Sequence, residues 1–486
     1  FYTEFNNFQD TMIANSNPSI QRGVGYNQID LTNKILYKLN ATSKLIINSQ
    51  FSSSSNLLRL DQLNNLTLNN LPEYAQWSYG PQKRLLNSIA FSSSFSSILF
   101  DDFRAVFSHQ YIQESRITRR FNSFFQKNSV ENVNVLGYNI QLSKSIGSNS
   151  KLDYGTEIYY NRVDSRAYVL NLLDSSTSFI DSRYPNGGSN TFFPAIYGSY
   201  NLKKNRLSII GGIRYTWSHA SGIFNDNILD FLSEGFEIKR HSLSGSLSTY
   251  FYPNETTKIF LDLSTGFRAP TQGQVNVVNT QTTLVDGQLT QAQTLPGFKL
   301  GAGQLNPEEA TNTSFGLVYN AGDLSFTADF FVIELEDRVA LTSNAAPTAA
   351  QVAAMGAAGI PNPELIGQVN YFTNDFDTET TGYDLVAVYN TELFGADADI
   401  SAAWNHTETE VTNSGAVTGA SKIKRLEEGL PEDRMTITVA QTWSDKVSSF
   451  VRANMYGEYY AVHADWFGTT SDAEWTVDAS VSVQLT

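Results

Sequence analysis

The sequence contains no cysteine among its 486 residues, so disulfide bonds take no part in its folding. This absence does not exclude the periplasm or the cell surface, because an oxidising compartment permits disulfides without requiring them. An excess of positive charge is absent too. The chain has 33 lysine and arginine residues against 48 aspartate and glutamate residues, a formal net charge of −15. Since a nucleic-acid-binding protein needs a basic face, this balance argues against that class.

Long apolar runs are also missing. No window approaches the roughly 18 consecutive apolar residues of a transmembrane helix, which excludes that kind of membrane segment. Aromatic residues, in contrast, make up 13% of the chain. A large soluble β-sandwich or β-helix is compatible with this composition. A membrane-spanning β-barrel fits as well, because its lipid-facing residues alternate with polar lumen-facing ones and its aromatic residues gather at the lipid headgroups.

Alternation with a period of two recurs from one end of the chain to the other. Leu324, Phe326, Ala328 and Phe330 share one face, for example, and the polar residues between them share the other. At 477–485, valine, alanine and leucine alternate with aspartate, serine and glutamine. This pattern predicts β-strands. One short helix is expected in the alanine-rich segment at roughly 347–359.

The connections between these strands alternate in length. Short turn signals lie near 40–44, 147–151, 203–206, 253–257, 320–323 and 395–397. Long polar stretches lie between them, at roughly 53–83, 114–134, 164–190, 218–238, 270–310, 340–370, 406–432 and 458–474. Outer-membrane barrels have short periplasmic turns and long extracellular loops. The expected fold class is therefore all-β, a transmembrane antiparallel β-barrel with about 17 strands in this chain.

Two short motifs lie near the middle of the chain. Residues 264–270 read Ser-Thr-Gly-Phe-Arg-Ala-Pro, and residues 305–309 read Leu-Asn-Pro-Glu-Glu. A predicted strand pair, 313–319 and 324–335, follows them and leads into Glu336-Asp337-Arg338. In this order and spacing the segments resemble the FRAP and NPxL boxes of TonB-dependent receptors, and the resemblance extends over essentially the whole chain. The motif residues that it marks are Phe267, Arg268, Ala269, Pro270, Asn306, Pro307 and Glu308.

The resemblance implies an energy-coupled importer in the bacterial outer membrane. Its barrel would be filled by an N-terminal plug, and TonB with its inner-membrane energising complex would act on that plug. The implied cargo is an iron-bearing small molecule, haem or a ferric siderophore, which is transported and is no permanently bound cofactor. Lipopolysaccharide and outer-membrane lipid would surround the barrel. Other functions remain open: a passive porin or secretion pore, an adhesive barrel, or a receptor for cobalamin or a glycan.

Residues 1–486 are expected to form one incomplete β-barrel domain. The sequence starts at Phe1 without methionine or export signal and ends at Thr486 within a strand pattern, while lipid does not tolerate open strand edges. A plug and one strand are expected before Phe1, and residues before about Gly23 are assigned to the first extracellular loop. Four further strands, in roughly 60–100 residues after Thr486, would give about 22 in all.

Two branches of the family are resembled by different parts of the chain. Residues 59–61, 74–84, 114–121 and 183–188 resemble haem and haemoglobin receptors. Residues 380–384, 404–409 and 426–434 are similar to siderophore-type receptors. In haem receptors a histidine usually lies between the two boxes, and here none occurs between Pro270 and Asn306. This departure argues against haem ligation from that loop.

Candidate ligand contacts are the basic cluster Arg116, Arg119 and Arg120 together with Arg268, because arginine binds carboxylates in a bidentate fashion and the implied cargo is anionic. Pairing of these arginines with lipopolysaccharide phosphates or neighbouring carboxylates is the alternative role. The FRAP and NPxL residues have an alternative role too, which is to maintain barrel and loop geometry.

Aromatic residues of the predicted loops form a second group of candidates, which could cover a flat ligand or instead pack the loops. This group comprises Trp77, Tyr79, Phe124, Phe125 and Tyr184. The histidines are His109, His219, His241, His406 and His463, of which His219 is the first candidate iron ligand. A solvated surface role is the alternative for each histidine. No phosphate-binding loop, metal-ligand spacing or nucleophile elbow occurs, so no enzyme is predicted.

Overall fold

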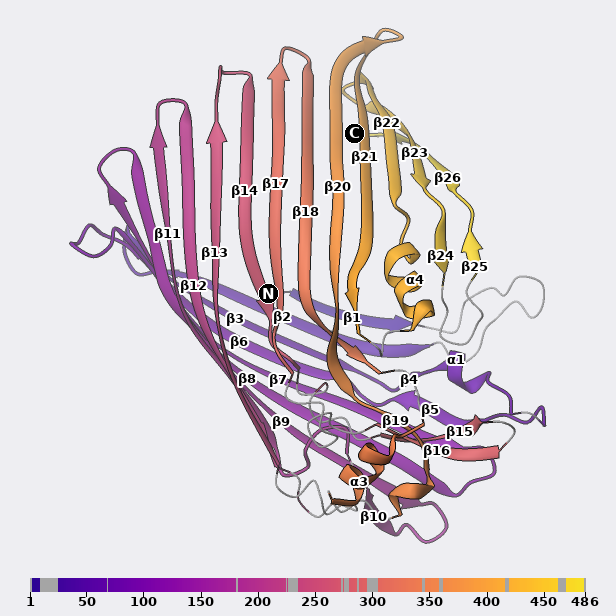
Figure 1. The fold of residues 1–486 in the computed structure, drawn as a ribbon. Coiled ribbons are helices and arrows are strands. Elements are labelled where there is room, and N and C mark those ends of the chain that lie inside the picture. Colours follow the sequence, from indigo (N-terminus) through magenta and orange to yellow (C-terminus); the bar gives the residue numbers. More distant parts are fainter. Residues whose placement is uncertain are drawn as a thin grey trace.

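The computed structural model describes most of the chain. The described residues are 2–8, 25–67, 69–180, 182–223, 225, 235–271, 274, 279–285, 288–294, 305–342, 346–357, 362–415, 419–461 and 469–484. Nearly all of them belong to one antiparallel sheet of 21 strands, which curves into the wall of a barrel (Figure 1). The expected all-β fold class is thus confirmed.

In the first half of the sheet, each long strand pairs with the next long strand along the chain. The strands are β1 (Tyr2–Phe8), β2 (Tyr26–Lys38), β3 (Ser43–Ser54), β4 (Leu57–Leu58), β5 (Tyr74–Tyr79), β6 (Lys83–Ser94), β7 (Asp102–Arg120), β8 (Phe125–Ile146), β9 (Ser150–Asn171), β10 (Thr177–Ile180), β11 (Ser189–Lys204) and β12 (Leu207–Gly222).

The second half continues the same antiparallel order. Its strands are β13 (Phe236–Phe251), β14 (Thr257–Arg268), β17 (Glu308–Ala321), β18 (Leu324–Leu341), β20 (Phe372–Leu393), β21 (Ala396–Ser414), β22 (Asp433–Ser444), β23 (Val447–Tyr456) and β26 (Glu474–Val483). Two small sheets lie beside it, formed by β15 (Asn279–Val285), β16 (Gln288–Thr294) and β19 (Ile366–Asn370), and by β24 (Tyr459–Ala461) and β25 (Thr469–Ser471).

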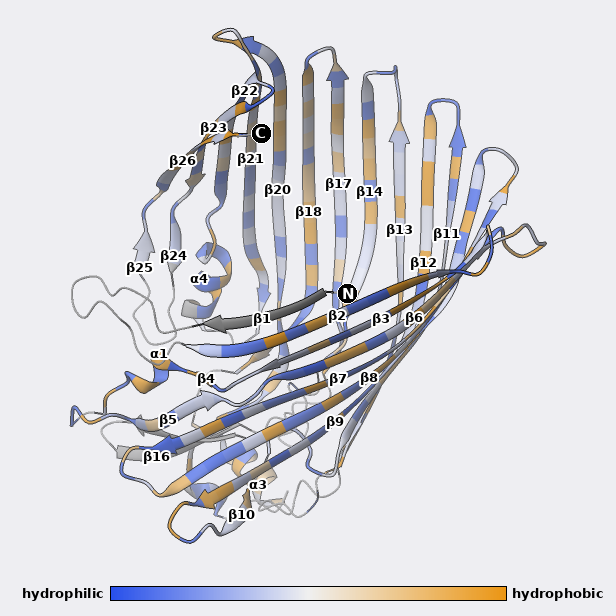
Figure 2. Ribbon diagram, turned by 180° about the vertical axis from the view of Figure 1, so that it is seen from behind, coloured by the Kyte–Doolittle hydropathy of each residue, from blue (hydrophilic) through white to orange (hydrophobic). Residues whose placement is uncertain are grey.

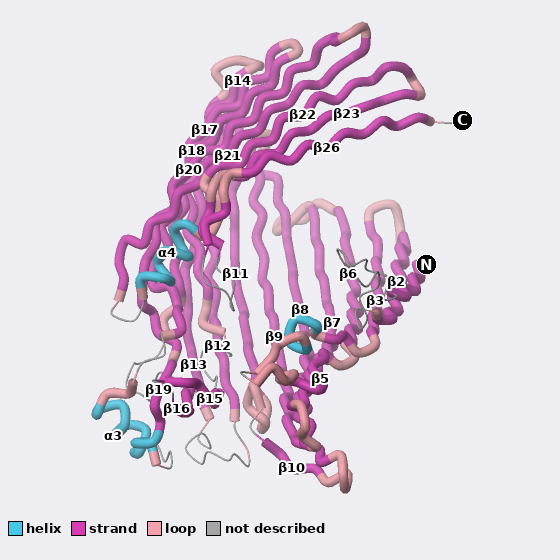
Figure 3. The backbone as a smooth tube through the Cα atoms, turned by 90° about the vertical axis from the view of Figure 1, so that its right-hand side faces the viewer, coloured by secondary structure: helices cyan, strands magenta, loops and turns pink. Residues whose placement is uncertain are grey.

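Three short strands, β4, β5 and β10, lie beside the ends of longer ones, which leaves eighteen strands in the wall among the described residues. The sequence predicted about 17, and the additional one is β1. Because Tyr2–Phe8 pairs with β2 in antiparallel register, the assignment of all residues before Gly23 to a loop was wrong for this segment. In the described part of the chain, β1 pairs only with β2 and β26 only with β23, and Figure 3 shows the sheet open between them.

The predicted alternation produces two faces of opposite character. On β18, Phe330 is half exposed, and its face carries the apolar residues that the sequence pattern grouped together. The opposite face carries Asp329, which pairs with Asp384 of β20. Figure 2 shows polar and apolar residues alternating along the strands. The apolar face meets lipid, and the polar face lines the lumen.

All six predicted short turns are confirmed, and they lie at one end of the wall. The shortest are two-residue turns such as Phe394-Gly395, where both residues have positive φ angles of 54° and 78°. Two positive φ angles match the twist of the flanking strands, and Gly395 adopts such an angle without strain. Two further short connections at this end, 95–101 and 445–446, were not predicted.

At the end of the wall opposite the short turns, several strands extend further than the sequence predicted. The stretch 114–134 was predicted as a loop, but β7 continues to Arg120 and β8 begins at Phe125. Likewise β9 continues through the predicted loop at 164–190 as far as Asn171. Both β8 and β9 have 22 residues, about twice the 9–11 needed to cross a bilayer. Polar composition marks where lipid ends, whereas the backbone ladder continues into water.

Helices occupy connections between the strands. The helix expected at 347–359 is confirmed as α3 (Ala349–Ala357). The short α1 (Leu60–Leu63), the 3-10 turn η3 (Pro363–Leu365) and α4 (Ala420–Glu428) were not predicted. A Lys424–Glu428 ion pair of 3.6 Å lies along α4, and its Lys422 donates to the Leu341 carbonyl at 2.9 Å. Among the described residues, no helix is long and apolar enough to span a membrane.

Spin labels can test the two faces, because the chain has no cysteine to remove. In a bilayer, a label at Phe330→Cys should collide frequently with oxygen, which concentrates in lipid. A label at Thr327→Cys, on the opposite face of the same strand, should collide more with a water-soluble nickel complex. Electron paramagnetic resonance power saturation measures both collision rates. Equal accessibility at the two positions would contradict the assigned faces.

Candidate functional site

The wall is extended above the lipid by short strands that run beside β7. β6 pairs with β7 up to Lys83, and β5 resumes the pairing from Tyr79, opposite Arg116. Gly80 lies at the junction and donates its N–H to the Ser115 carbonyl at 2.8 Å. A Cβ atom there would lie 1.9 Å from the Ser115 hydroxyl, so only glycine lets the two strands approach this closely. β4 then pairs with β5.

This extension brings two arginines and two aromatic rings together. The Arg59 guanidinium lies 4.7 Å from the Trp77 ring centre, and that of Arg116 lies 5.7 Å from the same ring. Tyr79 meets Trp77 edge-on at 5.3 Å and accepts a 2.7 Å hydrogen bond from Arg59. We call Arg59, Trp77, Tyr79 and Arg116 the Arg–aromatic cluster. Cations over aromatic faces are favourable, so the cluster holds two positive charges in place.

Arg59 is oriented from its other side by Asp61 in α1. Its Nε donates to the Asp61 carboxylate at 2.7 Å, and a second guanidinium nitrogen forms an ion pair with the same group. This hydrogen-bonded partner holds the pKa of the Asp61 carboxyl well below its usual range, so Asp61 is ionised at neutral pH. Arg59 therefore has its charge balanced locally, whereas Arg116 has no ion-pair partner within 4 Å in the described part of the chain.

An open hollow of about 900 Å³ lies beside the Arg–aromatic cluster. Its wall is formed by the upper parts of β7, β8, β9 and β11, and it is covered by residues that follow β14 and by the start of β20. Strands this far apart in a curved wall can line one hollow only from the concave side, so the hollow lies on the lumen side. We call it the outer hollow, and its lining includes Tyr79, Arg116, Arg183, Tyr184, Pro270 and Phe372.

A fixed segment, residues 182–188, supplies the second arginine of the outer hollow. The Gly187 N–H donates to the Ile223 carbonyl at 2.9 Å, and Pro185 is fully buried against the end of β12. The Arg183 guanidinium then lies 5.6 Å from the Tyr184 ring centre. Arg116 and Arg183 flank Glu131, a carboxylate of β8 that also lines the hollow. Glu114 of β7 lines the hollow as well, so the two arginines stand beside two glutamates there.

The predicted basic cluster of three arginines is split between different surroundings. Only Arg116 lines the outer hollow, and its Nε is buried without a hydrogen-bond partner among the described residues. Arg120 shares its face but forms an ion pair with Glu73 and lies over the Tyr74 ring at 4.4 Å. Arg119 faces the opposite side, because strand side chains alternate, and it donates to the Ser123 carbonyl at 3.0 Å.

The two motif boxes meet across one strand pair. β14 and β17 place Arg268 opposite Glu308, and the two side chains form an ion pair of 2.5 Å. Glu308 is only 6% exposed and also accepts the Val339 N–H of β18 at 2.8 Å. The Arg268 side chain remains more than half exposed. Among the described residues the FRAP arginine therefore has a structural partner, while Ala269 and Pro270, which follow it, line the outer hollow. Phe267 lies in β14 opposite Glu309.

The rest of the NPxL box is held by a bulge in β18. Asn306 donates its N–H to the Asn374 side chain at 2.8 Å, and Asn374 donates back to the Asn306 carbonyl at 3.2 Å. Asn374 also donates to the carbonyl of Asp337, a residue with a positive φ of 56° at the register shift between β18 and β20. Pro307 leads directly into β17. The geometric role of these boxes, one of the two that the sequence left open, is thus visible in the contacts.

The histidines are dispersed over the wall. His219 lies 3.0 Å from Glu237, His109 lies 3.2 Å from Asn134, and His406 lies 3.0 Å from Asp433. His241 packs against Tyr215, and His463 lies outside the described residues. No three histidine or acidic side chains gather in metal-binding geometry in the described part of the chain. The predicted loop aromatics Phe124 and Phe125 are exposed and do not line the outer hollow.

Residues 2–486 match the family described as "TonB dependent receptor-like, beta-barrel". The chain belongs to this family. TonB-dependent receptors are outer-membrane β-barrels, which confirms the predicted location. No curated protein sequence matches the chain.

Solved structures of TonB-dependent receptors share this receptor's fold at low sequence identity. The copper transporter OprC has a TM-score of 0.69 and 14% identity over 100% of this chain and 68% of its own. The FrpB iron transporter from Neisseria meningitidis (F3-3 variant) has a TM-score of 0.64 and 10% identity over 99% of this chain and 69% of its own. The ferric yersiniabactin uptake receptor FyuA from Yersinia pestis has a TM-score of 0.62 and 12% identity over 100% of this chain and 67% of its own. Such identities establish the shared fold alone.

Sequence reasoning about the receptor missed two residues of the site. Arg59 and Arg183 supported only the branch resemblance, since nothing local in the sequence shows that β4 adds to the wall or that residues 182–188 dock on β12. A signal was nevertheless present: arginine next to aromatic residues recurs at 74–84, 114–121 and 183–184. This recurrence indicates a cation–aromatic surface once the segments are known to be adjacent.

The Arg268–Glu308 pair gives a stability prediction for the receptor. Glu308→Ala removes the acceptor of both the Arg268 guanidinium and the Val339 N–H, at a cost of roughly 1–3 kcal/mol. Glu308→Gln keeps one acceptor and should cost less. The temperature at which the heat-modifiable band shifts on an SDS gel should therefore fall most for Glu308→Ala. The control is Glu309→Gln on the neighbouring, exposed side chain. An unchanged transition for Glu308→Ala would refute the structural role.

Proposed function

We propose that this receptor imports an anionic iron chelate, haem or a ferric siderophore, and that the chelate binds in the outer hollow. The observation that carries the proposal is the pair of arginines on the lumen wall, Arg116 and Arg183, beside the partly buried rings of Tyr79 and Tyr184. Family membership supports ligand transport coupled to TonB. The inner-membrane energising complex and the surrounding lipopolysaccharide are further partners under this proposal.

The chemistry of the hollow suits a ligand with negative charge and flat groups. Arginine presents several N–H donors in a fork that matches a carboxylate. Arg116 is partly exposed, and its guanidinium forms no ion pair or side-chain hydrogen bond with another described residue, so a ligand oxygen could accept from its accessible N–H groups without displacing a protein contact. Aromatic faces beside the arginines supply contact area for a ring system. Trp77 orients Arg116 from behind through its own ring.

The remaining predicted contacts take different parts in this proposal. Arg268 stays paired with Glu308 and holds the segment with Ala269 and Pro270 over the hollow, so it positions the cover more than it binds the ligand. Arg120 is paired with Glu73, and Arg119 faces away. His219 has a carboxylate partner and does not line the hollow. Ligand contact is therefore assigned to Tyr79, Arg116, Arg183 and Tyr184.

Similar structures support iron as the cargo but also name a rival. Among them are an iron transporter and a ferric yersiniabactin uptake receptor, and another is a copper transporter. Copper transport is thus a second candidate. The described lining contains no thiol, thioether or imidazole, the ligands that copper prefers, and its two glutamates stand beside two arginines. This favours an anionic chelate over copper itself. The resemblance to haem receptors stays a prediction.

Uptake of radiolabelled iron by a strain that carries only this receptor tests the proposal. Arg116→Gln and Arg183→Gln should each weaken binding of the transported chelate by roughly 10- to 100-fold, since one charge-assisted hydrogen bond is lost. Arg119→Gln, on the same strand but the opposite face, is the matched control and should leave uptake unchanged. Heat-modifiable mobility on an SDS gel checks that each variant is folded.

The competing functions give different results in the same strain. Transport of copper, cobalamin or a glycan with no iron complex taken up would refute the cargo. Uptake that continues without TonB would indicate a passive pore. Equal loss in the Arg119→Gln control would refute the outer hollow as the binding site while leaving the iron cargo intact.

A further inference from the structure

A row of positive side chains crosses the wall near the short turns, far from the outer hollow. Lys38 of β2 pairs directly with Lys44 of β3. Ser92 of β6 pairs with Lys44 on one side and with Arg104 of β7 on the other. Directly paired residues of neighbouring strands point to the same side of a sheet. We call Lys38, Lys44 and Arg104 the periplasmic cationic row, since short turns mark the periplasmic end.

The periplasmic cationic row faces the lumen. β7 and β8 pair without a register shift from Asp102 to Arg119, so Arg104 and Arg116 lie on one face. Arg116 lines the outer hollow, which is on the concave side. The outward face at the same level is apolar, with Tyr37 and Leu39 exposed next to Lys38. At about 3.3 Å per residue, roughly 40 Å of β7 separates the row from the outer hollow.

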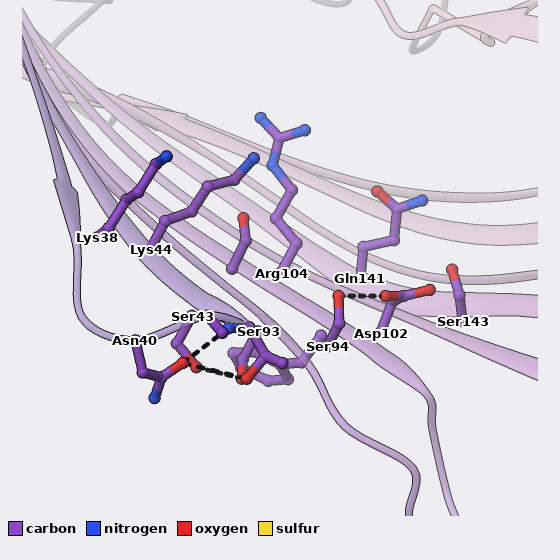
Figure 4. A pocket seen from close by; sticks show the side chains of 14 residues that line it. Lys38, Asn40, Ser43, Lys44, Ser93, Ser94, Asp102, Arg104, Gln141 and Ser143 are labelled. Atoms are coloured by element: carbon purple, nitrogen blue, oxygen red, sulfur yellow. Dashed lines mark hydrogen bonds between the residues drawn. The ribbon is translucent and has the colours of Figure 1, made fainter.

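The three side chains border an open pocket of about 610 Å³ (Figure 4). Figure 4 shows Lys38, Lys44 and Arg104 projecting to the same side of the strands. All three are exposed, and none forms an ion pair or a side-chain hydrogen bond with another described residue. The pocket contains one carboxylate, Asp102, which accepts a 2.6 Å hydrogen bond from Ser94 and is not within ion-pair distance of the row.

Two other cations at the same end of the wall have carboxylate partners. Lys144 forms an ion pair with Asp101 at 2.8 Å, and this hydrogen bond lowers the pKa of the Asp101 carboxyl to about 2. Lys151 pairs with Asp153 at 2.9 Å. In a chain with a net charge of −15, acidic residues are available to neutralise surface cations. The three cations of the row lack such partners in the described part of the chain, and so do Lys203, Lys204 and Arg206. Lys203 and Lys204 are consecutive in β11 and point to opposite faces, however, whereas the row lies on one face beside a pocket.

We infer that the periplasmic cationic row is an anion-binding site for small molecules that carry two or more carboxylate or phosphate groups. Lys38 and Arg104 are three strand spacings apart, about 14–15 Å, so a multivalent anion can contact two or three cations at once. A monovalent anion would contact one. Each contact is exposed to water and contributes little, so binding is weak and is screened by salt. The inference is independent of the proposed iron cargo.

Calorimetric titration of the purified protein in detergent tests the inference at low ionic strength. The probes are citrate, a carboxylate, and pyrophosphate, a phosphate, with acetate as the monovalent comparison. All titrations use the Arg116→Gln, Arg183→Gln background, so that the outer hollow does not contribute. Adding Lys38→Gln, Lys44→Gln and Arg104→Gln should weaken binding by about tenfold or more, because several exposed ionic contacts are lost.

The matched control removes the same charge elsewhere at the periplasmic end. Lys203→Gln, Lys204→Gln and Arg206→Gln change three exposed cations at the turn between β11 and β12 and should leave the affinity within about twofold of its starting value. Binding of citrate alone assigns the site to carboxylates, binding of pyrophosphate alone assigns it to phosphates, and binding of both supports the shared chemistry.

Three results would overturn the inference. The first is no saturable binding of either multivalent anion. The second is an equal loss of affinity in the control triple variant, which would show a general charge effect. The third is unchanged binding in the row variant together with a lower unfolding temperature, which would show that the row stabilises the protein instead.

Discussion

Backbone hydrogen bonding between neighbouring strands is the interaction on which the other features of this protein depend. In lipid, an unpaired N–H or C=O group costs several kcal/mol, so each strand that crosses needs a partner on both sides. Every wall strand from β2 to β23 has two such partners. Pairing also fixes which residues share a face. Because β7, β8 and β9 keep pairing beyond the lipid, Arg116 lies on a rigid wall instead of a loop, as a preorganised binding residue requires.

Motif residues and the residues proposed to contact the ligand have separate tasks in this arrangement. Arg268 and Glu308 join β14 to β17 at the upper end of the wall, and the Glu308 carboxylate ties β18 to both. The segment after Arg268 is thereby held over the outer hollow. The contacts proposed for the ligand come from segments outside the two boxes, chiefly Arg116 and Arg183. In this proposal a family motif supports the shape of the site, and positions outside the motif supply its chemistry.

The sequence predicted what depends on local pattern. Period-two alternation identified β18 and its two faces, and turn residues identified the short end of the barrel. Strand ends in water were mispredicted, because polarity reports the lipid boundary while hydrogen bonding decides where a strand stops. The split between Arg116 and Arg119 was missed because 114–134 was predicted as a loop. In the continuous strand β7, residues three apart point to opposite faces. Arg183 joins the site only through the docking of its segment on β12, a contact between residues far apart in sequence.

A structure of the protein with a bound ferric chelate tests the central claim most directly. The account predicts an anionic group of the chelate within hydrogen-bond distance of the Arg116 and Arg183 guanidinium groups, while Arg268 remains paired with Glu308. A chelate that instead contacts an Arg268 released from Glu308, and makes no contact with Arg116, would contradict it.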